Sequence, residues 1–143
     1  FAAALEGAIT RTTGTGDPLA VAVVDVDHFK TINDLHGHDE GDRVLVALAD
    51  MLKSQAAGRG MAARHGGEEF VVLLPGATLE EARLQCEFMR QSVGLLPIGL
   101  PVSVSLGVAT HRRGDAAEDL FRRADQALYE AKRGGRDRVV AAD

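Results

Sequence analysis

Apolar and polar positions along the chain follow two periods, and each period predicts a kind of element. Leu19–Asp25 is a continuous valine-rich run between polar segments, which is typical of a central strand covered on both faces. Apolar side chains at helical spacing predict amphipathic helices over Phe1–Arg11 and Glu40–Gln55. Thr78 with Glu81 three residues later predicts a capping box at the start of another helix, which ends near position 93.

The rest of the pattern completes an α/β arrangement. It predicts a short helix before Gly37, strands over Met61–His65, Glu69–Leu74, Val102–Thr110 and Asp137–Ala141, a helix over Ala116–Arg133, and loops over Thr12–Pro18, Ala56–Gly60 and Gly94–Pro101. We therefore expect an α+β sandwich in which a mixed sheet of about five strands is covered by helices. The nearest common architecture is the ferredoxin-like palm, in which two strands carry acidic residues at adjacent ends.

Composition narrows the class of protein. The chain has 143 residues, the size of one domain. Its formal charge of −5 argues against a surface that coats nucleic acid. The single cysteine, Cys86, excludes an internal disulfide, and no apolar run reaches the roughly 20 residues that span a bilayer. Without a secretory signal pattern, we expect a cytoplasmic domain, whose full-length protein can be membrane-anchored through upstream segments.

An acidic pair closes the first predicted strand. The two-residue period of a strand puts Asp25 and Asp27 on one side and Val24 and Val26 on the other. Buried carboxylates are costly unless their charge is compensated. A metal ion is one compensation. The alternative, about equally favoured by this motif alone, is that Asp27 caps the next helix and Asp25 pairs with a lysine or arginine.

A second acidic pair lies at the tip of the predicted hairpin. Gly66 and Gly67 permit unusual backbone angles and a close approach of a ligand, and Glu68 and Glu69 follow them directly. Such a tip is by itself more often a solvated turn. Together with the aspartates of the first strand, however, it offers the hard oxygen ligands that Mg²⁺ with a nucleoside triphosphate prefers.

Several blocks now resemble one known family in order, from position 20 to position 140. Gly66–Phe70 is similar to the signature of the GGDEF family of diguanylate cyclases, in its GGEEF form. The other matching blocks are Asp25–Asp34, Gly37–Asp42, Ser103–Ala109, Ala124–Lys132 and Gly134–Val139. The resemblance implies a palm related to nucleotidyl cyclases, which joins two GTP molecules into cyclic di-GMP and pyrophosphate. It also implies that two domains must face each other as a homodimer.

The resemblance also implies a metal site and catalytic groups. Asp25 and Glu68, with the backbone carbonyl of Val26 and with Glu69, would hold Mg²⁺, or Mn²⁺ as an alternative. Glu68 is also the presumed proton acceptor for the attacking 3′-hydroxyl. Lys30 would assist by neutralising the triphosphate.

The nucleotide residues implied by the resemblance each have a simpler interpretation. Asn33 and Asp42 would bind guanine, although an asparagine often ends a helix and an aspartate often begins one. His38 and Leu45 would line the base pocket, or serve as a capping and a core residue. The N–H groups around Phe29 and Lys30 would hold phosphates. Lys132 and Arg136 would neutralise the triphosphate. Their simpler interpretation is that positive charge near the end of the preceding helix interacts favourably with the helix dipole.

Two departures from the family pattern stand out. Many members carry an inhibitory Arg-x-x-Asp that binds product, and its positions are Ala57 and Gly60 here. We therefore expect this inhibitory site to be missing. A block that precedes the first helix in the family is also missing, so we interpret residues 1–143 as a single catalytic domain, truncated at its N-terminus, that lacks upstream sensory or dimerisation domains.

Two other functions compete with a cyclase. One is a degenerate module that binds GTP or cyclic di-GMP without turnover, although every expected metal and base-binding residue is present. The other is a palm that acts on ATP or a primer, which Asn33, Asp42 and the negative charge disfavour.

Overall fold

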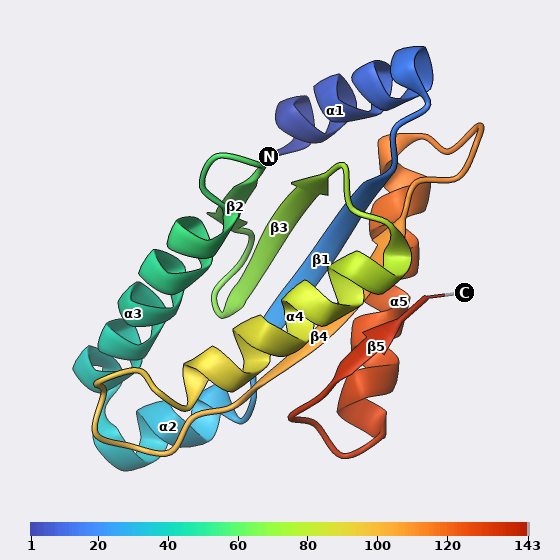
Figure 1. Cartoon of the computed structure of the whole chain (residues 1–143). Helices are drawn as coiled ribbons and strands as arrows, with labels where there is room; N and C mark the ends of the chain where they lie inside the picture. Colours follow the sequence, from blue (N-terminus) through green and yellow to red (C-terminus); the bar gives the residue numbers. More distant parts are fainter. Residues whose placement is uncertain (143) are drawn as a thin grey trace.

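The computed structural model describes residues 1–142, which form five helices and five strands. In chain order these are α1 (Ala2–Thr15), β1 (Leu19–Val26), α2 (Phe29–His36), α3 (His38–Ala56), β2 (Met61–Arg64), β3 (Glu69–Pro75), α4 (Leu79–Val93), β4 (Val104–Thr110), α5 (Ala117–Arg133) and β5 (Val139–Ala141). Figure 1 shows the strands as one twisted sheet, with helices packed around it. No helix among these residues has both the length and the apolar composition needed to cross a membrane.

The sheet is mixed, as expected. Its strand order is β2-β3-β1-β4-β5, with β1 at the centre. β1 pairs antiparallel with β3 and with β4, whereas β4 and β5 are parallel. This α+β sandwich with a five-stranded mixed sheet confirms the predicted palm architecture.

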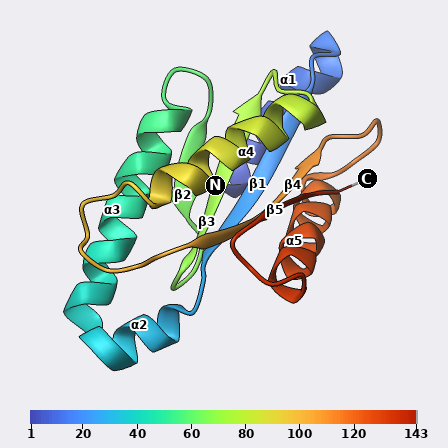
Figure 2. The ribbon, with the colours of Figure 1, turned by 60° about the horizontal axis from the view of Figure 1, so that its bottom comes forward.

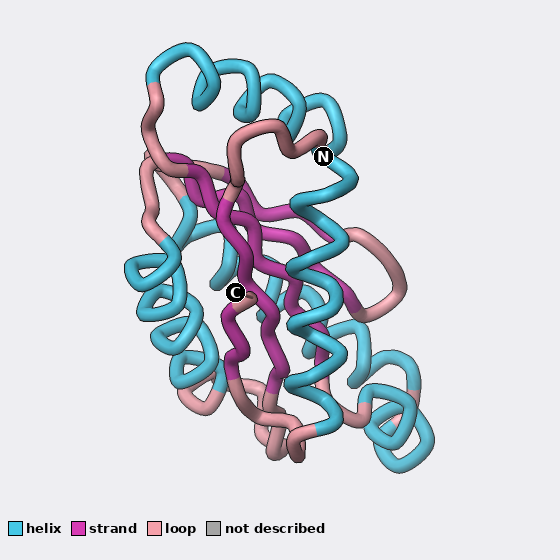
Figure 3. The backbone as a smooth tube through the Cα atoms, turned by 90° about the vertical axis from the view of Figure 1, so that its right-hand side faces the viewer, coloured by secondary structure: helices cyan, strands magenta, loops and turns pink. Residues whose placement is uncertain are grey.

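Two layers of helices bury the two faces of the sheet (Figures 2 and 3). On one face, α3 and α4 pack on even-numbered positions of β1 such as Val24 and Val26. On the other face, α1 and α5 pack on odd-numbered positions such as Val21 and Val23. Every residue of β1 is buried, because both faces are covered. The strand period therefore directs Asp25 toward the α5 layer.

The first helix is longer than predicted. α1 continues through the segment 12–15, which was expected to form a loop. The Thr15 hydroxyl donates to the Arg11 carbonyl at 3.1 Å, and the N–H of Gly16 donates to the Thr12 carbonyl at 2.7 Å. These bonds satisfy the last carbonyls of the helix, and they outweigh the weak helix propensity of threonine. As predicted, no side chain caps the start of this helix.

Two strands also start two residues later than predicted. β4 begins at Val104 rather than at position 102, and β5 begins at Val139 rather than at position 137. Asp137 has a φ of 46°, which is left-handed and incompatible with a strand. The capping box of α4 is confirmed: Thr78 and Glu81 exchange side-chain and backbone bonds of 3.0 and 3.2 Å.

Candidate functional site

The C-terminal end of β1 and the loop between β2 and β3 lie side by side at one end of the strands, which forms the carboxylate edge of the sheet. Asp25 lies opposite Glu69 in the antiparallel register, and the N–H of Val26 donates to the Glu68 carbonyl at 3.3 Å. Directly opposed residues of an antiparallel pair project from the same face. The structure thus brings together the acidic groups that the sequence analysis predicted to meet.

Asp25 is the least satisfied charged group of this edge. It is only 4% exposed, and one of its oxygens, Oδ2, forms an ion pair with the Lys132 ammonium of α5. Its other oxygen, Oδ1, is buried and has no hydrogen-bond partner among the described residues. A buried carboxylate oxygen without a donor is costly, so this atom is suited to a ligand that supplies positive charge.

The two glutamates of the hairpin have raised pKa values. Burial is the largest cause for Glu68, and the negative charge of the neighbouring Asp25 raises its pKa further. Burial also raises the pKa of Glu69, with Asp125 of α5 as the next cause. Crowded carboxylates therefore resist ionisation at this edge, which is the condition that a divalent cation relieves.

The hairpin tip owes its shape to Arg64 rather than to unusual glycine angles. Neither Gly66 nor Gly67 has a positive φ, so the tip does not use the left-handed angles that glycine permits. Arg64 donates from Nε to the Gly66 carbonyl at 3.1 Å and from Nη2 to the Gly67 carbonyl at 2.6 Å. These bonds brace the loop that presents Glu68.

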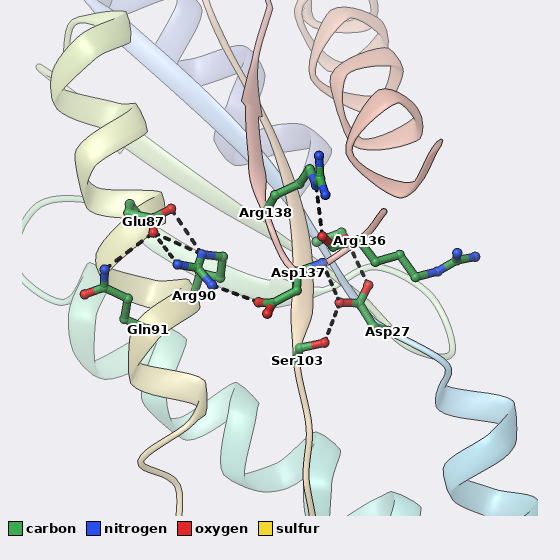
Figure 4. A network of polar contacts seen from close by, with 9 residues as sticks. Asp27, Glu87, Arg90, Gln91, Ser103, Arg136, Asp137 and Arg138 are labelled. Carbon is green, nitrogen blue, oxygen red and sulfur yellow. Dashed lines mark hydrogen bonds and ion pairs between the residues drawn. The ribbon is translucent and has the colours of Figure 1, made fainter. Parts of the chain in front are cut away.

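Asp27 has a different environment from Asp25, and the sequence analysis missed its role. It does not cap α2, whose N-cap is His28 without a side-chain bond. Instead, Asp27 accepts from the Ser103 hydroxyl at 2.7 Å, from the Ser105 hydroxyl at 2.6 Å and from the N–H of Asp137 at 3.0 Å. Figure 4 shows Asp27 with Ser103 and the loop around Asp137. No local signal could have revealed partners this far along the chain.

A second unsatisfied group lies between α2 and α3. The Oδ1 atom of Asn33 is buried without a hydrogen-bond partner among residues 1–142. A Cβ at Gly41 would lie 1.8 Å from this oxygen and 3.2 Å from the Phe29 ring, so the close approach requires glycine. Asp42 follows Gly41 on α3 and is exposed. The alternative that Asn33 ends the helix is not what the structure shows, because the C-cap of α2 is Gly37.

The other predicted site residues surround these two groups. Lys30 and His38 are exposed in the first turns of α2 and α3, whereas Leu45 is only 3% exposed and packs in the core beneath α3. Arg136 is exposed in the loop that follows α5. Lys132 lies in the last turn of α5, but it contacts Asp25 rather than acting only on the helix dipole.

The carboxylate site lies apart from two cavities of the domain. The structure has cavities of about 690 Å³ between α1 and α5 and about 420 Å³ between α3 and α4, and neither is lined by Asp25 or Glu68. Among residues 1–142, no group of three or more histidine, cysteine, aspartate or glutamate side chains is arranged to hold a metal. Two carboxylates with further ligands from backbone, water or substrate phosphates are nevertheless a common way to bind Mg²⁺.

An α+β palm with acidic groups at adjacent strand ends is the class that this fold and site define. The family described as "Diguanylate cyclase, GGDEF domain" matches residues 1–138, and the chain belongs to this family.

Relatives and solved structures agree. The chain is 45% identical over 143 residues to diguanylate cyclase DgcP of Pseudomonas aeruginosa, covering 96% of this chain and 21% of that protein. It resembles the active GGEEF domain of a diguanylate cyclase from Vibrio cholerae, with 36% identity, a TM-score of 0.93, and 99% and 94% of the two chains covered. It also resembles the GGDEF domain of DgcB from Caulobacter crescentus in complex with c-di-GMP, with 36% identity, a TM-score of 0.91, and 96% and 85% covered.

Proposed function

We propose that this domain is the catalytic domain of a diguanylate cyclase that converts two GTP molecules into cyclic di-GMP and two pyrophosphates. In each half-reaction, the 3′-hydroxyl of one GTP attacks the α-phosphate of the other. A P–O bond forms to the 3′-oxygen, the hydroxyl proton is removed, and pyrophosphate leaves. The family assignment and the relatives named diguanylate cyclase support this activity.

The observation that carries the proposal is the unsatisfied, buried Oδ1 of Asp25 beside Glu68. A fold that only needed a core would not retain two crowded carboxylates at a strand end. The residues fit a divalent cation: Asp25 and Glu68 would hold it, with the Val26 carbonyl and Glu69 as further ligands. When bound, Mg²⁺ or Mn²⁺ would offset the negative charge of the phosphates and of the transition state.

Glu68 would also accept the proton of the attacking 3′-hydroxyl, because its carboxylate would lie beside the cation and the nucleotide. Burial and the negative charge of Asp25 raise its pKa in the absence of a cation, and a cation bound by both carboxylates would lower it again. Lys132 would hold the Asp25 carboxylate in place and lend positive charge to the triphosphate.

Guanine would bind between α2 and α3. The unpartnered Oδ1 of Asn33 and the exposed carboxylate of Asp42 are acceptors, and the N1–H and exocyclic amine of guanine are matching donors. His38 would lie at the mouth of this site, while the buried Leu45 would form its floor. The base would then be distinguished from adenine, whose Watson–Crick edge lacks both donors.

The triphosphate would lie between the base site and the carboxylates. α2 begins at Phe29 without a side-chain cap, so its first N–H groups are suited to phosphate oxygens. Lys30 in the same turn and Arg136 on the loop after α5 would supply the remaining positive charge.

A second copy of the domain is part of the proposal. The reaction joins two GTP molecules, and this domain has one proposed site for GTP. We propose a homodimer in which the two edges face each other, as each 3′-hydroxyl must reach the α-phosphate held by the other copy. Residues 1–143 would be one catalytic domain, and upstream sensory or dimerisation domains would control how often two copies meet.

The inhibitory product site of many family members would be missing. Its two side-chain positions are Ala57 and Gly60, and neither carries a charge. A Cβ at Gly60 would lie 1.8 Å from the Leu73 carbonyl oxygen, so this backbone cannot accept an aspartate there. We expect cyclic di-GMP to bind, if at all, at the active-site edge.

Product formation tests the proposal directly. The domain is incubated at high protein concentration with GTP and Mg²⁺, and cyclic di-GMP is measured by mass spectrometry alongside pyrophosphate release. We expect both products with GTP, none with ATP, and none from Glu68→Ala. Asp50→Ala, an exposed change on α3, serves as the matched control. Tight GTP binding without any product would instead identify a module that binds without turnover.

A further inference from the structure

The loop that carries Arg136 has an uncommon backbone conformation. Arg136 has a φ of 65° and Asp137 a φ of 46°, so two consecutive residues that are not glycine are left-handed. This region is disfavoured for residues with a Cβ, and such conformations persist only where surrounding contacts enforce them. Contacts with the rest of the fold must therefore hold Arg136 and Asp137 in this conformation.

Contacts with three other elements hold the loop, and Figure 4 shows those of Asp137. The N–H of Asp137 donates to Asp27 Oδ2 at 3.0 Å, and the Arg90 guanidinium of α4 bonds Asp137 Oδ1 at 2.8 Å. The N–H of Arg136 donates to the Ala131 carbonyl at 3.0 Å. The loop is thus tied to β1, to α4 and to α5 at once.

Asp27 is the most rigid of these anchors. It is 6% exposed, and the Ser103 and Ser105 hydroxyls of the neighbouring chain segment donate to its two oxygens. The carboxylate has no freedom to turn, and its remaining capacity is directed at the backbone of Asp137. Because Asp27 follows Asp25 by two residues, it fixes the Arg136 loop relative to the carboxylate site.

We propose that Asp27 is a positioning residue for triphosphate binding: through the Asp137 N–H it holds Arg136 where its guanidinium meets the outer phosphates of the nucleotide. Asp27 itself contacts no nucleotide. This inference rests on the proposed function, because it needs Arg136 to be a phosphate ligand.

If Asp27 positions Arg136, its loss affects GTP and GMP binding differently, whereas the loss of a purely structural residue would affect both alike. Displacing Arg136 weakens binding of GTP, which has outer phosphates, and leaves binding of GMP unchanged. We expect Asp27→Ala to lower the ratio of GTP affinity to GMP affinity about tenfold, the effect of one charge-assisted contact. Asp27→Asn keeps the shape with a weaker acceptor, so it lowers the ratio by a smaller factor, about threefold.

A double-mutant cycle tests the coupling. Dissociation constants for GTP and for GMP are measured by calorimetry with Mg²⁺, at a protein concentration too low for two domains to meet. The proteins are the unmodified domain, Asp27→Ala, Arg136→Ala and the double variant. Arg133→Ala, an exposed arginine at the end of α5, is the control and keeps the ratio unchanged. Thermal unfolding confirms that each variant is folded.

The expected result is that Asp27→Ala and Arg136→Ala lower the ratio equally and that the double variant is no worse than either. Additive effects, or an equal loss for GMP, would overturn the inference. If Asp27→Ala is unfolded at the assay temperature, the same cycle is run with Asp27→Asn, and an unchanged ratio overturns the proposal. A domain that binds no GTP would refute the proposed function as well, whereas tight GTP binding with an additive cycle refutes only the role of Asp27.

Discussion

Asp25 lies on β1 and Asp27 in the turn directly after it, and both are more than nine-tenths buried, yet their surroundings are opposite. Asp27 accepts from two hydroxyls and one backbone N–H. Asp25 has one ammonium partner, Lys132, an oxygen with no partner, and the glutamate of the hairpin beside it.

The difference indicates that the Asp27 carboxylate stabilises the fold, whereas the Asp25 carboxylate is available to bind a ligand. A buried acid with all its donors in place stabilises the structure around it. A buried acid with an unsatisfied oxygen next to Glu68 costs stability, and such a cost is retained where function requires it. The same strand end therefore holds a structural anchor and a candidate metal ligand.

The largest effect is expected from Asp25→Asn. The change removes a negative charge beside Glu68 and a ligand of the cation, so cyclic di-GMP formation should fall at least about hundredfold. Folding should not suffer, because the amide keeps the shape of the carboxylate. Mass spectrometry of the product and thermal unfolding check the two halves of this expectation. Turnover near that of the unmodified domain would remove Asp25 from the site.

The opposite behaviour is expected from Asp27→Ala. It leaves one buried and two partly buried donors without an acceptor, so the free energy of unfolding should fall by about 2–3 kcal/mol. Urea unfolding measures the loss, and Asp50→Ala on exposed α3 should stay within about 0.5 kcal/mol of the unmodified domain. Equal stability of the Asp27 and Asp50 variants would erase the contrast between the two strand-end aspartates.

Asn33, like Asp25, has a buried oxygen without a hydrogen-bond partner in the described part of the chain, and we propose that it binds guanine together with Asp42. A substitution of Asp42 tests this proposal. Asp42→Asn replaces an acceptor with a partial donor, so GTP binding should weaken about tenfold relative to ATP binding. Binding of both nucleotides is measured by competition. If the two affinities fall together, Asp42 acts on the helix and not on guanine.

The smallest expected effect is the contribution of Glu68 to the pH dependence of stability. Its pKa is raised above the ordinary value of 4.5, so the folded domain binds more protons than the unfolded chain as the pH rises through this range. The contribution of Glu68 to the free energy of unfolding should therefore decline as the pH rises above about 4.5, and Glu68→Gln should remove this decline.

At neutral pH, Glu68→Gln should melt about 1–2 °C higher than the unmodified domain, a small gain because the site is partly solvated. Below pH 4.5 the two proteins should melt alike. Added Mg²⁺ should stabilise the unmodified domain more than the variant. A variant that melts lower at neutral pH would mean that the Glu68 charge is stabilising.

Much of the fold follows from local pattern. The continuous apolar run predicted a central strand covered on both faces, and the capping box predicted the start of α4 at its observed residue. Predictions failed where backbone bonds outweighed propensity, as in the last turn of α1. They also failed where tertiary contacts enforce a rare conformation, as at Asp137, which was expected in a strand.

The sequence by itself determined the periods, the caps, the acidic hairpin tip and the family, because these depend on residues that are neighbours in the chain. Only the tertiary structure decided which aspartate is satisfied. The partners of Asp27 are 76, 78 and 110 residues away, and Lys132 reaches Asp25 from the far end of the chain. Two chemically identical side chains at one strand end acquire different roles because packing, and not local sequence, supplies donors to both oxygens of Asp27 but to only one oxygen of Asp25.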